Sequence, residues 1–143
     1  MNNNSDFVIS SDPTLLQIDA IHNFLKQTHW AANRKRETIV KSIQNSLCFG
    51  VYHHGIQIAF ARIVTDYCTF AYLCDVFVEE KFRGRGISKW IMEHVMAHPD
   101  LKNLRRFLLA TKDAHTLYSR YGFQPINEEE KALLMGIRND LAC

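Results

Sequence analysis

The segment VEEKFRGRGISKW, residues 78–90, joins an apolar run to a new amphipathic run and places two glycines among basic side chains. Gly84 and Gly86 lack a Cβ, so their backbone tolerates positive φ and allows a ligand to approach closely. The helix that we expect to follow begins with unpaired N–H groups at the positive end of its dipole. With the charges of Arg83 and Arg85, these groups favour a phosphate or pyrophosphate site, although the segment alone also fits a plain strand-to-helix turn.

The length and composition of the chain favour one globular domain with a core of ordinary size. Its 143 residues are 47% hydrophobic and 22% charged, so we expect a single domain over residues 1–143, with a disordered tail at residues 1–6. The formal net charge of +2 is too balanced for a general polyanion binder. We therefore expect no nucleic-acid partner, in spite of the local cluster of basic residues around the glycines.

The N-terminus and the cysteines favour a cytoplasmic protein. The first six residues contain no basic segment followed by an apolar core, and no apolar run reaches the roughly 20 residues of a membrane span. None of the four cysteines belongs to a C-x-x-C pair, and three of them lie in apolar runs. We expect reduced thiols, a cytoplasmic location and no membrane partner.

Apolar periodicity and turn residues predict an α+β domain in which helices and strands are mixed along the chain. The strands are expected at residues 7–10, 47–52, 56–64, 70–78, 106–110, 123–126 and 133–138. The helices are expected from Asp12 and Pro13 to about residue 27, at 34–45, at 86–97, and at 113–121 between a cap at Asp113 and a stop at Gly122. The strand–helix–strand unit over residues 70–110 implies one parallel pair in a mixed, mostly antiparallel central sheet, flanked by about four helices.

Two motifs of the chain resemble the GNAT superfamily of N-acetyltransferases. VFVEEKFRGRGISKWIMEHV, residues 76–95, is similar to the family's acetyl-coenzyme A motif, Q/R-x-x-G-x-G/A at a helix start, with Ser88 where Gly or Ala is usual. AHTLYSRYGFQPI, residues 114–126, resembles the family's A-x-x-x-Y-x-x-x-G-F segment. A P-loop is absent, and a dinucleotide motif would need a third glycine after Gly86. The resemblance implies the GNAT acyl-CoA N-acyltransferase fold, in which the parallel pair of strands is splayed.

The resemblance places acetyl-CoA, as co-substrate, along the strand, turn and helix of residues 76–88. The pantetheine arm is expected to lie as a pseudo-strand along Val76, Phe77 and Val78, with the thioester near residues 74–76. The pyrophosphate is expected on the backbone N–H groups of the turn, which is formed by Arg83, Gly84, Arg85, Gly86, Ile87 and Ser88. Thr111 stands where the family often has an asparagine and is assigned to the same site.

Five further residues are candidates for catalysis or acceptor binding. Tyr118, the tyrosine of the second motif, is the candidate general acid for the leaving thiolate, with a core aromatic role as the alternative. Asp75 stands in an otherwise apolar strand and is either the general base or, equally, a structural hydrogen-bond acceptor. His29 with Trp30, and Asp66, are candidates for binding the acceptor substrate.

The implied activity is transfer of an acetyl group from acetyl-CoA to a primary amine by direct attack in a ternary complex. The acceptor is a small-molecule amine or an amine of a peptide or protein, and the sequence does not decide between them. An acetyl-CoA-binding regulatory or sensor module without turnover is the alternative function. We expect no metal, because His94 and His98 lack a third ligand, and no acyl-enzyme at Cys74. A homodimer is compatible with the sequence, which does not test it.

Overall fold

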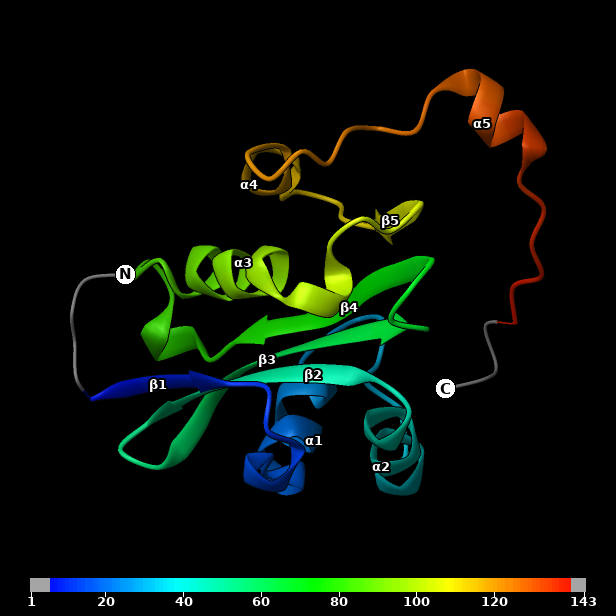
Figure 1. The fold of residues 1–143 in the computed structure, drawn as a ribbon. Helices are drawn as coiled ribbons and strands as arrows, with labels where there is room; N and C mark the ends of the chain where they lie inside the picture. Colours follow the sequence, from blue (N-terminus) through cyan, green and yellow to red (C-terminus); the bar gives the residue numbers. More distant parts are fainter. Residues whose placement is uncertain (1–5, 140–143) are drawn as a thin grey trace.

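The computed structural model describes residues 6–139 and contains a five-stranded sheet in the order β1-β2-β3-β4-β5 (Figure 1). The strands are β1 (Phe7–Ser10), β2 (Leu47–His53), β3 (Ile56–Thr65), β4 (Phe70–Val78) and β5 (Arg106–Leu109). Neighbouring strands are antiparallel except β4 and β5, which are parallel. The structure therefore confirms a mixed α+β fold with one parallel pair.

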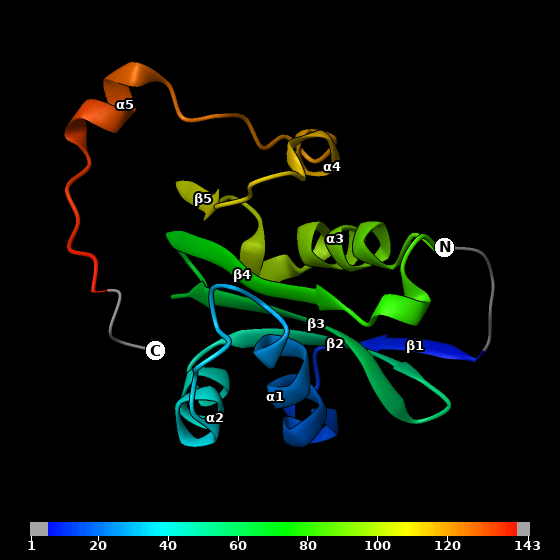
Figure 2. The ribbon, with the colours of Figure 1, turned by 180° about the vertical axis from the view of Figure 1, so that it is seen from behind.

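Helices cover both faces of this sheet. They are α1 (Ile18–Lys26), α2 (Arg36–Gln44), α3 (Ile87–Ala97), α4 (His115–Ser119) and α5 (Glu128–Leu133), with short 3₁₀ turns η1 (Pro13–Leu15), η2 (Glu80–Phe82) and η3 (Pro99–Leu101). Figures 1 and 2 show α1 and α2 on one face, and α3 and α4 on the other. Within residues 6–139, no helix combines the length and the apolar character that a membrane span requires.

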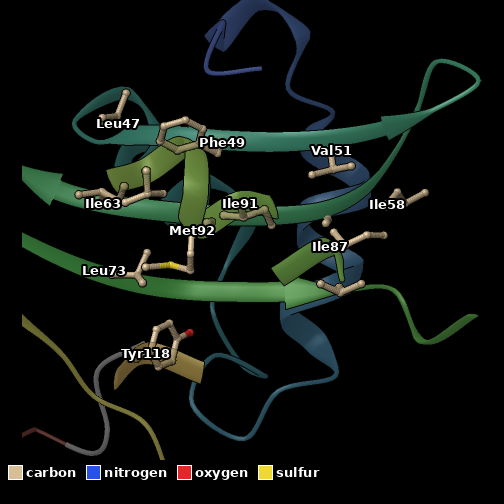
Figure 3. Packing of buried hydrophobic residues seen from close by; sticks show 14 of the residues in the cluster. Leu47, Phe49, Val51, Ile58, Ile63, Leu73, Ile87, Ile91, Met92 and Tyr118 are labelled. Atoms are coloured by element: carbon tan, nitrogen blue, oxygen red, sulfur yellow. The ribbon is translucent and has the colours of Figure 1, made fainter. Parts of the chain in front are cut away.

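Each face of the sheet has its own apolar core, because side chains alternate between the two faces along every strand. The core under α3 and α4 includes Leu47, Phe49, Val51, Ile58, Ile63, Leu73, Ile87, Ile91, Met92 and Tyr118 (Figure 3). The core under α1 and α2 consists of Ile21, Phe24, Leu25, Ala31, Ile39, Ile43, Cys48, Phe60 and Phe77. β4 contributes to both cores, and this double burial fixes its position at the centre of the candidate site.

The structure confirms the strands predicted up to residue 110 and the helices predicted at 34–45 and 86–97, to within two residues at each end. The first helix begins later in the chain than predicted, at Ile18 and not at Pro13. Asp12 caps only the 3₁₀ turn η1, by accepting a hydrogen bond from the Thr14 N–H at 2.9 Å. The chain is then extended at Gln17, whose N–H donates to Gln57 Oε1 at 2.9 Å, and α1 begins after it. A tertiary contact thus overrides the local helix signal.

The predicted cap of α4 at Asp113 is wrong. The N-cap residue is Ala114, and its N–H donates to Thr111 Oγ1 at 3.1 Å. The stop at Gly122 is confirmed, since this glycine has φ +93° just beyond the end of α4. The helix is therefore shorter than predicted, although the motif tyrosine Tyr118 still lies on it.

The two strands predicted at 123–126 and 133–138 are not formed. No strand follows β5 in the part of the chain up to Asn139, and residues 128–133 instead form α5. Asn127 caps this helix by accepting a hydrogen bond from the Glu130 N–H at 2.8 Å, and three glutamates occupy its first turn. A strand also requires a partner, and these residues find none within the described chain.

The predicted tail at residues 1–6 lies mostly outside the described residues, which begin at Asp6. Asp6 itself is part of the fold, because its carbonyl oxygen accepts a hydrogen bond from the His54 N–H at 3.3 Å.

Candidate active site

The turn between β4 and α3 has the backbone geometry that its glycines predict. Gly84 and Gly86 have φ +79° and +78°, values that residues with a side chain rarely adopt. Gly86 is the N-cap of α3, no side chain caps this helix, and its first turn contains no acidic residue. Among residues 6–139, none accepts a hydrogen bond from the N–H groups of residues 84–89. The start of α3 therefore offers several free donors to an anion.

Arg83 uses its own polar groups to hold this turn in place. Its N–H donates to the Glu80 carbonyl at 3.1 Å, and its Nε donates to the Val78 carbonyl at 2.8 Å. The guanidinium carbon also lies 5.3 Å from the centre of the Phe77 ring. The free amides thus begin at Gly84, one residue later than the sequence predicts.

The edge of β4 that faces β5 is unpaired along its second half. The parallel pairing runs from Phe70 with Arg106 to Leu73 with Leu109 and ends there. Val76, Phe77 and Val78 continue β4, but no strand within residues 6–139 pairs with their β5 side. The two strands are therefore paired at one end and separate at the other, which leaves backbone groups of β4 available to an extended ligand.

A bulge in β4 lies where the two strands separate. Phe60 pairs with Phe77 and Arg62 pairs with Cys74, so Asp75 and Val76 together face one residue of β3. Asp75 has φ +53°, an uncommon value for a residue other than glycine. Such a bulge bends the strand and turns its backbone groups at the position where the resemblance places the thioester.

Three side chains from other elements hold the carboxylate of Asp75, whose side chain is only 2% exposed. Trp30 Nε1 donates to Oδ1 at 3.1 Å. Arg34 Nη1 and Arg62 Nε each donate to Oδ2 at 2.8 Å. Arg62 Nη1 also donates to Ser46 Oγ at 3.1 Å. Two cations therefore compensate the buried anion, and the carboxylate acts as a brace beneath the bulge.

Sequence reasoning missed Arg34 and Arg62 as members of this site. One signal was available: Asp75 is a carboxylate in an apolar strand, and a buried carboxylate requires cationic or hydrogen-bonding partners. Arg62 is also a charged residue in the middle of the apolar strand β3. The sequence does not show that Arg34, 41 residues away, reaches the same carboxylate.

Tyr118 is buried at the end of the apolar core under α3 and α4. Figure 3 shows its ring beside Leu73, on the side of β4 away from β3. Burial, followed by the negative charge of Asp113, raises the pKa of its phenol above the usual value. The phenol is therefore held in its protonated form at neutral pH, as a proton donor must be.

The other predicted site residues lie in different surroundings. Thr111 Oγ1 accepts the hydrogen bond that starts α4, and Trp30 belongs to the Asp75 network. His29 is exposed, with its ring 5.2 Å from that of Trp30. The hydrogen bond from the Thr69 hydroxyl, followed by those from the N–H groups of Thr69, Cys68 and Phe70, lowers the pKa of the Asp66 carboxyl. Asp66 thus organises the turn between β3 and β4.

Two thiols lie near the bulge, those of the buried Cys48 and the half-buried Cys74. Burial raises the pKa of Cys74 to about 11 and that of Cys48 to about 12. A thiol with so high a pKa contains very little thiolate at neutral pH, and the thiolate is the nucleophilic form. This chemistry does not favour an acyl-enzyme at Cys74.

Two other surface features lie apart from this site. A shallow hollow on the outer side of α2 is lined by Arg36, Glu37, Val40, Lys41, Gln44 and Asn45. At the start of β1, potential metal-ligand atoms of Asp6, His53 and His54 all lie within 4.8 Å of one another, and the His54 and Asp6 side chains approach to 3.8 Å. Neither feature includes a residue of the β4–α3 turn.

Comparisons with known proteins agree with this geometry. Residues 44–125 match the acetyltransferase (GNAT) domain family. A crystal structure from Xanthomonas campestris pv. campestris, described as a GNAT-family acetyltransferase, is 50% identical, with 94% of this chain and 95% of that chain covered and a TM-score of 0.88. The protein FG08082 of Gibberella zeae, which is named as an acetyltransferase, is 29% identical to this chain. The match covers 80% of this chain and 77% of that protein.

A more distant structure shares the fold alone. It comes from Clostridium acetobutylicum and is described as an acetyltransferase with acetyl-CoA. Its sequence identity is 14%, its TM-score is 0.64, and 92% of this chain and 94% of that chain are covered. The family match extends from the end of α2 to the residues just beyond α4 and so includes the bulged strand, the glycine turn and Tyr118. The chain belongs to the GNAT family of acetyltransferases.

Proposed function

We propose that this protein transfers the acetyl group of acetyl-CoA to a primary amine by direct attack in a ternary complex. One observation carries the proposal: free N–H groups at the start of α3 continue from an unpaired edge of β4 that ends at a bulge. These features suit, in order, a diphosphate, an extended amide-containing arm and a thioester. Family membership supports acetyl-CoA as the donor.

The turn would bind the diphosphate through backbone groups. The amides from Gly84 to Lys89 have no acceptor among residues 6–139, so a diphosphate would satisfy donors that the fold leaves free. Arg85 and Lys89 are exposed beside them and add positive charge. The positive φ of both glycines keeps this backbone uncovered by side chains.

The separated half of β4 would bind the pantetheine arm. Phe77 and Val78 pair with β3 and have buried side chains, and the half-buried Val76 belongs to the bulge beside them, so the free backbone edge of this segment is held in place. An arm with two amides could add to this edge as a short strand. At the bulge, a β4 N–H would stabilise the oxyanion that forms when the amine attacks the thioester carbonyl.

Three proton transfers complete the reaction. The ammonium form of the acceptor releases one proton to solvent before attack, and the second proton, which the attacking nitrogen loses as the amide forms, replaces the proton that Tyr118 donates. The C–S bond breaks, and the Tyr118 phenol donates a proton to the sulfur, so that free CoA thiol leaves. We assign Asp75 the structural role rather than that of the base, because two guanidinium groups and an indole N–H already occupy its oxygens.

The test is an assay of thiol release with acetyl-CoA and a panel of small amines and peptide amines. Tyr118→Phe should lower kcat roughly a hundredfold, in the range that positioned general acids contribute, and leave acetyl-CoA affinity unchanged. Tyr121→Phe is the matched control, because that tyrosine lies on the same turn of chain and its hydroxyl donates only to the Lys89 carbonyl at 3.2 Å. Binding of acetyl-CoA without thiol release across the whole panel would instead support the sensor module.

A further inference from the structure

A cluster of potential metal ligands lies at the start of β1, on the edge of the sheet opposite β5. Asp6 directly precedes β1, His53 ends β2, and His54 follows in the turn to β3. Ligand atoms of the three side chains lie within 4.8 Å of one another, and His54 Nε2 is 3.8 Å from Asp6 Oδ2. Figures 1 and 2 both show the start of β1 beside the β2–β3 turn. Two imidazoles and one carboxylate are thus brought together from segments far apart in the sequence.

Backbone contacts hold these three residues in place. Phe7 pairs with His53, and the Asp6 carbonyl accepts a hydrogen bond from the His54 N–H at 3.3 Å. Successive residues of a strand point to opposite faces, yet the ring centroids of His53 and His54 are only 4.2 Å apart. The turn explains this, because His54 and Gly55 have φ +50° and +78°. Positive φ at both positions turns the His54 side chain out of the alternation of the strand.

The fold itself gives the two imidazoles little to do. A two-residue turn with positive φ at both positions favours Asn or Asp before the glycine, so His54 is not the residue that the turn prefers. The half-buried His53 packs its ring 4.4 Å from Phe7 and 5.1 Å from Phe82. Within residues 6–139, no hydrogen bond reaches a ring nitrogen of either histidine. These nitrogens therefore suit a partner from outside the chain.

The chemistry of the three side chains selects the kind of partner. Imidazole nitrogens with one carboxylate are typical ligands of Zn²⁺ and related transition ions, whereas Mg²⁺ and Ca²⁺ prefer oxygen ligands alone. Tetrahedral bonds of about 2.0–2.1 Å place neighbouring ligand atoms about 3.4 Å apart. The 3.8 Å between His54 and Asp6 is close to this separation. Both side chains are exposed, so rotation of either one supplies the remaining change.

From these observations we propose that Asp6, His53 and His54 bind a divalent transition-metal ion of the zinc class. Each histidine supplies one ring nitrogen, Asp6 supplies one carboxylate oxygen, and water takes the fourth position. The ion ties the residue before β1 to the β2–β3 turn, so its role is structural. The sequence shows the two histidines side by side, but the carboxylate reaches them only through the pairing of β1 with β2. The proposal does not rest on acetyl transfer.

The first test is calorimetric titration of the full chain, free of any affinity tag, with Zn²⁺. The native chain should bind one ion. His54→Asn keeps a residue that the turn favours and should weaken binding at least about tenfold, since even outer-shell changes at metal sites cost that much. Asp6→Asn should act alike. The control, His94→Gln with His98→Gln, removes another histidine pair and should bind zinc as the native chain does. Mg²⁺ should not bind.

Two outcomes of this titration would overturn the proposal. One is that the native chain binds no zinc up to about 1 mM. The other is that His54→Asn and the native chain bind zinc with equal affinity. Zinc should also raise the melting temperature of the native chain and of the control but not that of His54→Asn, because an ion stabilises only the state that it binds. A native melting temperature that saturating zinc does not change would contradict the structural role.

The second test locates the ion. A crystal soaked in Zn²⁺, with diffraction measured on both sides of the zinc absorption edge, should show an anomalous peak about 2 Å from ligand atoms of all three side chains. A zinc ion found only at His94 and His98, at Cys68 or between molecules of the lattice would overturn the assignment.

Discussion

The two ends of the unpaired half of β4 differ in whether their polar groups have hydrogen-bond partners within the fold. At the bulge, both oxygens of the Asp75 carboxylate have partners, which are Trp30 and Arg34 in the loop between α1 and α2 and Arg62 in β3. At the turn, the amides from Gly84 to Lys89 have no acceptor in residues 6–139. Buried polar groups in folded proteins are almost always satisfied. The contrast therefore separates a polar cluster that serves the fold from one that is free to bind a ligand.

Under the proposed function, this difference gives each end its own task in the reaction. The bulge must hold one backbone N–H at a fixed position while bond order changes, so a rigid brace beneath it is useful. The turn must accept a large charged group from water and release it, so its donors must be accessible. Both properties follow from which elements pack against each end: α1 and α2 cover the bulge, whereas Gly84 and Arg85 are exposed.

The largest effect is expected from removing the brace. Asp75→Ala leaves Arg34 and Arg62 in a half-buried site without their anion, and breaking a buried ion pair costs about 3–5 kcal/mol. The free energy of unfolding, measured by urea denaturation, should fall by that amount. Asp66→Ala is the control, because the Asp66 carboxylate serves an exposed turn and its loss should cost much less. If both variants lost the same free energy of unfolding, the claim that Asp75 stabilises the fold more than Asp66 does would be contradicted.

The next effect concerns thiol reactivity beside the bulge. At pH 8 the pKa of about 11 leaves Cys74 roughly one part in a thousand ionised, and burial also restricts access. A hydrogen bond with Asp66 also raises the pKa of the Cys68 thiol, but Cys68 is exposed, so its alkylation should still be roughly tenfold faster or more, as peptide mass spectrometry can measure. The difference should disappear in urea. Fast alkylation of Cys74 in the native protein would contradict this expectation and would support an acyl-enzyme at Cys74.

A smaller effect is expected from a single charge at the turn. Arg85→Ala removes one exposed cation beside the free amides, and its ring contact with Phe82, 5.3 Å from the guanidinium, is also lost. The affinity for acetyl-CoA should fall about three- to tenfold at low ionic strength, and less in salt, because exposed charges are screened. Thermal stability should change little. A loss of affinity that salt does not alter would show that Arg85 acts through the fold.

Much of this account could be predicted from the sequence, and the successes share one cause. The strands over residues 47–78 are apolar runs bounded by turn residues, and the α3 segment has helical periodicity after two glycines. Both patterns are local, and the structure confirms them. The positive φ of Gly84 and Gly86 was likewise predictable, because only glycine adopts it at low cost.

The failures also share a cause, which is dependence on distant residues. The start of α1 depends on Gln57 of β3, and the brace depends on arginines 41 and 13 residues from Asp75. The strand predicted at 133–138 depends on a partner that residues 6–139 of one chain do not supply. The helix at 128–133 is different, because Asn127 followed by glutamates is a local capping signal that the sequence contained.

The central claim is that the free amides of the β4–α3 turn bind the diphosphate of acetyl-CoA, and titration calorimetry of two glycine variants tests it directly. Gly84→Leu and Gly55→Leu are matched, because φ is +79° and +78° and neither site has an atom within 4 Å of an added Cβ. The strain of the substitution should therefore be similar. We expect Gly84→Leu to weaken acetyl-CoA binding at least roughly tenfold, about 1.4 kcal/mol, and Gly55→Leu to bind as the native chain does. Equal affinity in all three proteins would contradict the claim.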